Sequence, residues 1–182
     1  LPDRGLEVLL RAWKILDPRD AELTVYSSNI IYGKGYSDAR RGMYDQLFNE
    51  CKTIPGIVYK GYAMNQAVRK QLVQSHILAY PSIFPETSCL SAIEAGAAGG
   101  KIITTDYGAL PETCGTWATH VPYHDNIEIL AENYAEELGR AIDNYSFDSY
   151  NLQEQSQWFN TEYSWQARAQ EWINFFNSIC VK

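Results

Sequence analysis

Two carboxylates flank a stretch whose residue types suit a ligand-binding loop that leads into a helix. An apolar run ends at Pro81, and the loop after it carries Glu86, Thr87 and Ser88, with Glu94 eight residues beyond Glu86. Thr87 and Ser88 offer side chains that can cap the helix. The first N–H groups of a helix, reinforced by its dipole, favour an anion such as a diphosphate. The segment therefore predicts a site for a phosphate-containing ligand with carboxylates beside it.

The spacing of Glu86 and Glu94 argues against a pair of catalytic acids. If all the residues between them were helical, a rise of about 1.5 Å per residue would place them roughly 12 Å apart. The two carboxyl groups of a glycoside hydrolase lie roughly 5 to 9.5 Å apart, although a bent loop would shorten the distance here. Two carboxylates that each bind a different hydroxyl-rich part of one extended ligand suit the spacing better. A nucleotide sugar is such a ligand.

The elements that would position this loop alternate between strands and helices. An amphipathic helix is expected over Leu6 to Leu16, and further helices are expected near 43–51, 66–73 and 91–98. The β-rich runs start at Leu23, Ile57, Ile77, Lys101 and near His120. Such alternation, with nearly continuously apolar runs, indicates a parallel sheet covered on both faces. The fold class is therefore α/β, a doubly wound parallel sheet, in which ligands bind beyond the carboxyl ends of the strands.

The last part of the chain has helical signals alone. Helices are expected over 127–142, 152–159 and 165–180. The apolar residues that share one face of the last helix are Trp165, Trp172, Phe175, Phe176 and Ile179. A stripe of this kind needs burial, so we expect residues 146–182 to be C-terminal helices that pack on the α/β domain, residues 1–145, or on a second domain.

Composition narrows the function. The chain has 182 residues, a net charge of −7 and no cluster of Lys and Arg, which argues against nucleic-acid binding. Its apolar runs are far shorter than the roughly 20 residues that span a bilayer, and no leader-like segment opens the sequence, so a cytoplasmic protein is expected. The four cysteines form no C-x-x-C pair, which predicts free thiols. No Asp-x-Asp-like motif is present, and we expect neither a metal nor another cofactor.

The segment FPETSCLSAIEAGAAGGKIITTDYGALPE resembles the retaining glycosyltransferases of family 4, which have the GT-B architecture. It combines an E-x7-E motif, a small-residue helix, a strand and a G-G-x-P-E-like turn from Gly108 to Glu112. The resemblance covers nearly the whole chain and matches the family's C-terminal domain, a Rossmann-like unit that binds a nucleotide sugar. It implies transfer of a sugar from a UDP- or GDP-sugar with retention, and a missing N-terminal domain that would bind the acceptor. The family's first strand and an arginine upstream of Arg4 are also expected to precede this stretch.

The resemblance also implies the role of each site residue. Glu86, the catalytic-site residue, would contact hydroxyls of the transferred sugar, Glu94 would hold the ribose hydroxyls, and Arg4 would bind phosphate. Backbone groups would complete the site: amides of Thr87, Ser88 and Cys89 facing the sugar, amides of Leu90 and Ser91 facing the diphosphate, and the Gly61, Tyr62 and Ala63 turn against the base. The family usually has glycines and an aromatic residue at 87–89, so the side chains here are expected to crowd the sugar.

Other interpretations stay open at this point. Glu86 could simply stabilise a helix start, Glu94 could be a solvated helix residue, and Arg4 an exposed arginine. Cys89 has no histidine nearby in sequence that would activate it as a nucleophile. The alternative functions are a nucleotide-sugar epimerase of the same architecture and a non-catalytic module that binds sugar nucleotides. Peripheral association of the full enzyme with a membrane is compatible with all of these.

Overall fold

The computed structural model describes residues 4–30, 33, 35, 42, 44–147 and 149–180. Each predicted β-rich run contains a strand: β1 (Leu23–Val25), β2 (Ile57–Tyr59), β3 (Ile77–Tyr80), β4 (Lys101–Thr105) and β5 (Ala118–Val121). All the pairings between these strands are parallel. The last strand begins two residues earlier than the sequence suggested.

The predicted helices are also found. They are α1 (Leu6–Leu16), α3 (Asp45–Thr53), α4 (Asn65–Gln74), α5 (Leu90–Ala97), α7 (Ile127–Asp143), α8 (Ser149–Glu162) and α9 (Trp165–Cys180). Met43, at the start of the predicted helix region 43–51, lies outside the described residues. A short helix, α6 (Leu110–Cys114), and two 3₁₀ turns, η3 (Gly115–Trp117) and η4 (Tyr145–Phe147), were not predicted. Elements of five residues or fewer are too short to show a helical period.

Local interactions determine where α1 ends and where α7 begins. Asp17 ends α1 in a left-handed conformation (φ 41°), donating its N–H to the Trp13 carbonyl, and Pro18 follows. Asn126 caps α7, because its side chain accepts hydrogen bonds from the N–H groups of Glu128 and Ile129. The end of α1 and the start of α7 therefore follow ordinary stop and capping signals.

The parallel strands are divided between two sheets. One has the order β1-β2, and the other has the order β3-β4-β5. Both share a core with α1 and α7, because Leu23 and Ile57 from one sheet and Ile77 and Ala79 from the other pack against the same cluster. The α/β fold with parallel strands covered by helices is confirmed, but the described strands form two sheets where one was expected.

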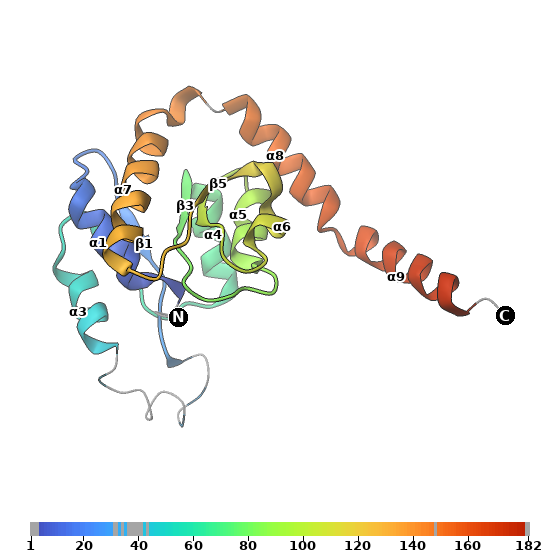
Figure 1. Cartoon of the computed structure of the whole chain (residues 1–182), viewed down its shortest axis with the longest axis horizontal. Helices are drawn as coiled ribbons and strands as arrows, with labels where there is room; N and C mark the ends of the chain where they lie inside the picture. Colours follow the sequence, from blue (N-terminus) through green and yellow to red (C-terminus); the bar gives the residue numbers. More distant parts are fainter. Residues whose placement is uncertain are drawn as a thin grey trace.

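Successive residues of the strands face opposite layers of helices. Ile103 of β4 packs with α1 and α7, whereas its neighbour Ile102 packs with Ala92 of α5 and Phe159 of α8. Figure 1 shows α1 and α7 on one side of β3 and β5, with α5 and α6 on the other. This is the alternation that a strand with two buried faces requires. The carboxyl ends of these strands lead into the loops that form the site below.

The C-terminal helices differ in how they pack. On α8, Phe159 is 1% exposed against α5, and the Gln155 side chain donates a hydrogen bond to the Gly100 carbonyl (2.8 Å). By contrast, α9 has no buried residue, and Trp165 is 88% exposed. Figure 1 shows α9 leading away from the rest of the molecule. Within the described residues, the apolar stripe of α9 is thus not covered by this domain.

None of the helices in the described residues is both long and apolar enough to cross a membrane.

Candidate functional site

The loop between β3 and α5 is anchored by the strand beside it. Thr104 and Thr105 of β4 donate side-chain hydrogen bonds to the carbonyls of Tyr80 and Ser82, at 2.9 and 2.7 Å. Both threonines are fully buried. On the other side, Gly5 lies so close to Pro81 that an added Cβ would stand 1.8 Å from the Pro81 carbonyl oxygen. The start of α1 and the end of β3 are therefore packed backbone to backbone.

Glu86 is held by two side chains. Its Oε1 lies 2.5 Å from a guanidinium nitrogen of Arg4 and accepts a hydrogen bond of 2.6 Å from the Tyr80 hydroxyl. The Glu86 side chain is only 9% exposed, and Arg4 stacks over the Phe84 ring at 3.7 Å. These contacts make Glu86 an oriented carboxylate that has partners on two other elements of the chain.

Tyr80 is a part of the site that the sequence did not reveal. Burial raises the pKa of its hydroxyl, and the neighbouring Cys89 and Glu86 raise it further, so Tyr80 remains a hydrogen-bond donor. The signal available in the sequence is a tyrosine that ends an otherwise apolar run, ILAY. A buried tyrosine needs a partner for its hydroxyl, and here that partner is Glu86.

The turn at Gly108 fixes the backbone of Glu86. Gly108 has a φ of +63°, and a Cβ added there would lie 2.5 Å from the Glu86 nitrogen and 2.8 Å from its carbonyl oxygen. The next amide, that of Ala109, donates a 2.7 Å hydrogen bond to the Glu86 carbonyl. Two separate parts of the motif segment, Glu86 and the turn that begins at Gly108, are therefore in direct contact. Glycine is required because only it tolerates both this φ and this approach.

The start of α5 has no side-chain cap. Cys89, not Thr87 or Ser88, is the N-cap residue, and no side-chain hydrogen bond caps the helix. The prediction that Thr87 or Ser88 caps α5 is therefore wrong, because the helix begins at Leu90, with Cys89 between Ser88 and the helix, and both Thr87 and Ser88 are exposed. First-turn N–H groups without a side-chain cap are the donors that bind anions at helix N-termini. Leu90, the first helical residue, is 70% exposed.

Cys89 points away from any ligand at this helix start. Its side chain is 3% exposed and packs in a core cluster with Leu110, Cys114 and Phe159. Burial raises the pKa of the Cys89 thiol, while the Ala92 and Ser91 amides oppose the rise. A protonated, buried thiol does not act as a nucleophile. The expected crowding of the sugar at 87–89 therefore reduces to the exposed side chains of Thr87 and Ser88.

Glu94 is also held, by an arginine from another helix. Arg69 of α4 donates two hydrogen bonds to Glu94 Oε1, from Nε at 3.0 Å and from Nη2 at 2.9 Å. The side chains are 26% exposed for Glu94 and 66% exposed for Arg69. Glu94 is therefore not simply solvated. Nothing in the sequence joins Arg69 to Glu94, because they are 25 residues apart on separate helices.

The turn of Gly61, Tyr62 and Ala63 lies between β2 and α4. Gly61 has a φ of +64°, and the Tyr62 side chain is 51% exposed. This turn connects to the α5 site through α4, which begins at Asn65 and carries Arg69. It follows the carboxyl end of a strand, where ligands bind in α/β folds.

Two other features do not add to this site. Within the described part of the chain, no three His, Cys, Asp or Glu side chains gather where they could hold a metal ion. A hollow of about 570 Å³ lies between α1, α3 and α7, away from the α5 start. Its charged lining consists of Glu7, Glu50, Glu128 and Glu132 with only Arg11 and Lys14 to pair with them, and this net negative charge disfavours a diphosphate.

Comparison with known proteins identifies the family. The family model described as "Glycosyl transferases group 1" matches residues 1–144. The chain belongs to this family. This agrees with the sequence resemblance at the level of a glycosyltransferase domain. None of the curated proteins matches the chain in sequence.

Solved structures share the fold of this glycosyltransferase domain. A glycosyltransferase from Rickettsia africae superposes with a TM-score of 0.70 at 19% identity, over 97% of this chain and 44% of its own. Sucrose-phosphate synthase from Thermosynechococcus elongatus gives 0.73 at 18% identity, over 98% and 43%. The pneumococcal O-GlcNAc transferase GtfA, solved with UDP and GlcNAc, gives 0.68 at 15% identity, over 100% and 34%. The chain has the Rossmann-like fold of GT-B glycosyltransferases and spans less than half the length of these structures.

Proposed function

We propose that this domain binds a nucleoside-diphosphate sugar at the start of α5 and is the donor half of a retaining family 4 glycosyltransferase. The observation that carries the proposal is the pair of oriented carboxylates, Glu86 and Glu94, on either side of a helix start without a side-chain cap. Glu86 accepts hydrogen bonds from hydroxyls of the transferred sugar. Glu94 accepts hydrogen bonds from the ribose hydroxyls.

The diphosphate binds between Arg4 and the first amides of α5, those of Leu90 and Ser91. The helix dipole and the guanidinium stabilise the negative charge that grows on the departing diphosphate, so no metal ion is needed. Arg4 pairs with Glu86 in the unliganded domain, and a diphosphate competes for it. Glu86 then keeps its hydrogen bond from Tyr80, which holds the carboxylate in place for the sugar.

The remainder of the enzyme supplies the acceptor site. The structures that this chain resembles are more than twice its length, which supports a second domain. The exposed apolar stripe of α9 is then covered by that domain. A helix that lies on a membrane surface would favour Lys and Arg on its polar face, but among the described residues of α9 the only Lys or Arg is Arg168. The nucleotide is uridine or guanosine diphosphate; the UDP bound to the pneumococcal enzyme supports the former. The enzyme works in the cytoplasm.

Isothermal titration of the 182-residue protein with UDP and with GDP tests the donor site. One nucleotide is expected to bind, and Glu94→Ala is expected to weaken it by about 1 to 3 kcal/mol through the lost hydrogen bonds. Glu154→Ala is the matched control, because it removes an exposed carboxylate from α8 and should leave binding unchanged. If neither nucleotide binds to this protein or to a chain extended upstream, the proposal is overturned.

Assays of the full enzyme test the reaction. Transfer to an acceptor distinguishes this proposal from epimerisation, which releases a free epimeric sugar. Activity that EDTA abolishes and manganese restores would contradict catalysis without a metal.

A further inference from the structure

Arg69 makes a contact with Glu94 that no sequence motif accounts for. Its Nε and Nη2 both donate to the same oxygen, Oε1, at 3.0 and 2.9 Å. Among the described residues, no other group donates a hydrogen bond to the Glu94 side chain, so Oε2 accepts none from them. A carboxylate oxygen accepts more than one hydrogen bond. Oε2 is therefore the atom available to two neighbouring hydroxyl groups.

The position of Arg69 connects two parts of the proposed donor site. Arg69 lies on α4, which begins at Asn65, just after the turn of Gly61, Tyr62 and Ala63. Glu94 lies on α5, and packing between α4 and α5 accompanies the ion pair. The helix that follows the turn proposed for the base is thus joined to the carboxylate proposed for the ribose by one ion pair.

We propose that Arg69 is a positioning residue that fixes the Glu94 carboxylate for recognition of the ribose diol. A glutamate with a quarter of its side chain exposed has several rotamers available, and holding one of them before the ligand arrives lowers the cost of binding. Arg69 fixes Oε1, and Oε2 accepts the ribose hydroxyls. This inference rests on the proposed function, because it assigns the second carboxylate of that site to ribose.

The alternative roles of Arg69 predict different results. If Arg69 bound the diphosphate, its loss would weaken any nucleoside diphosphate, with or without ribose hydroxyls. If Arg69 only competed with the ribose hydroxyls for the Glu94 carboxylate, its loss would tighten binding of the ribonucleotide. A positioning role predicts a loss confined to ligands that carry the hydroxyls.

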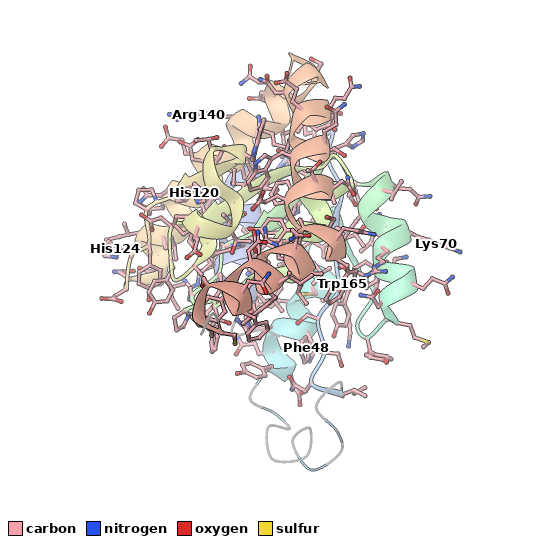
Figure 2. All side chains as sticks on the ribbon, turned by 90° about the vertical axis from the view of Figure 1, so that its right-hand side faces the viewer. Phe48, Lys70, His120, His124, Arg140 and Trp165 are labelled. Atoms are coloured by element: carbon pink, nitrogen blue, oxygen red, sulfur yellow. The ribbon has the colours of Figure 1, made fainter. Side chains whose placement is uncertain are left out.

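The experiment compares UDP with 2′,3′-dideoxy-UDP, or the guanosine pair if GDP is the nucleotide that binds, by isothermal titration. Arg69→Ala should weaken UDP about 5-fold, since the pair is partly exposed, and leave the dideoxy analogue unchanged. Lys70→Ala is the matched control, because Lys70 is the next residue of α4, is exposed and carries the same charge. Figure 2 shows Lys70 extending outward from its helix. Lys70→Ala should change neither affinity, and Arg69→Lys should fall between Arg69→Ala and the unmodified protein.

A double-variant cycle separates positioning from general effects. In a Glu94→Gln background, Arg69→Ala should cause no further loss of UDP affinity, because the two residues act on the same hydroxyls. Equal weakening of both nucleotides, additive losses, tighter UDP binding or no change would each overturn the role of Arg69. If the unmodified protein binds neither nucleotide, or binds both equally well, it is the ribose role of Glu94 in the proposed function that fails, and Arg69 loses its role with it.

Discussion

Substituting Gly108 by alanine tests whether the turn after β4 holds Glu86 in place. A Cβ at residue 108 would lie 2.5 Å from the Glu86 nitrogen and 2.8 Å from its carbonyl oxygen. Both atoms belong to the backbone, so no side-chain rotation can relieve the overlap. The loop at Glu86 must move away from the turn, and the 2.7 Å hydrogen bond from the Ala109 amide to the Glu86 carbonyl lengthens or breaks.

The expected loss of stability has three parts. Alanine at a positive φ costs about 1 kcal/mol, the lost hydrogen bond costs about 1 kcal/mol, and displacement of packed atoms costs about 1 to 3 kcal/mol. Gly99 supplies a matched control, since its φ is +82° and an added Cβ would meet nothing within 4 Å. Gly99→Ala therefore reports only the cost of alanine at a positive φ. Gly108→Ala should destabilise the domain by about 3 kcal/mol more than Gly99→Ala does.

Thermal unfolding followed by circular dichroism measures the difference. For a domain of this size, about 3 kcal/mol corresponds to a melting temperature lower by roughly 6 to 12 °C. The folded Gly108→Ala protein should also be titrated with the nucleoside diphosphate that binds and with the corresponding nucleotide sugar. Relative to the unmodified protein, it should lose more affinity for the nucleotide sugar than for the free nucleoside diphosphate. Equal melting temperatures for Gly108→Ala and Gly99→Ala would refute the reasoning, because they would show that the contact with Glu86 carries no energy.

Four further predictions follow from burial. A thiol reagent at pH 8 should label Cys180 alone in the native protein and all four cysteines in denaturant, because Cys51, Cys89 and Cys114 are buried; native labelling of a second thiol would contradict this packing. Burial raises the pKa of Cys51 to about 11, above the unfolded value of about 8.5. The unfolded state therefore loses this proton first, and the free energy of unfolding should fall as pH rises from about 9 towards 11. Cys51→Ala should flatten that part of a urea-midpoint profile, and a profile of unchanged slope would be evidence against the assignment. Tyr80→Phe removes the donor to Glu86 and should cost about 1 to 2 kcal/mol in urea unfolding; Tyr62→Phe, at an exposed site, should cost nothing measurable. Deleting residues 165–182 should leave the melting temperature within about 2 °C, whereas Phe159→Ala should cost about 3 to 5 kcal/mol; a large loss on deletion would show that α9 packs on this domain.

The sequence predicts the elements well because their signals are local. A strand such as β4 is buried on both faces, so KIITT stands out as a run of β-branched residues, and α1 shows its buried face in the spacing of its leucines. The five-residue helix α6 has too few residues for such a period, and it was missed. Pairing between strands is not local, so nothing in the composition of β1 or β3 shows that they belong to different sheets.

The site was predicted in part for the same reason. Glu86, Glu94 and the turn at Gly108 lie in one segment with a recognisable pattern, and the structure brings Glu86 and Gly108 together. The capping prediction failed because preference for Thr or Ser is statistical, whereas the helix starts where the Cys89 side chain enters the core. Contacts from distant elements, such as that of Arg69 with Glu94, depend on how the helices pack.

The partners of Glu86 explain how an acidic protein can hold a diphosphate. The chain carries a net charge of −7, and an unpaired carboxylate at the α5 start would repel the diphosphate that the positive end of the helix dipole attracts. Arg4 cancels the charge of Glu86 in the unliganded domain, and Tyr80 adds a neutral hydrogen bond to the same oxygen. In the proposed site these two partners are not interchangeable. Arg4 can leave Glu86 and pair with the diphosphate instead. Tyr80, whose pKa is raised by burial, stays protonated and keeps Glu86 oriented after Arg4 has left.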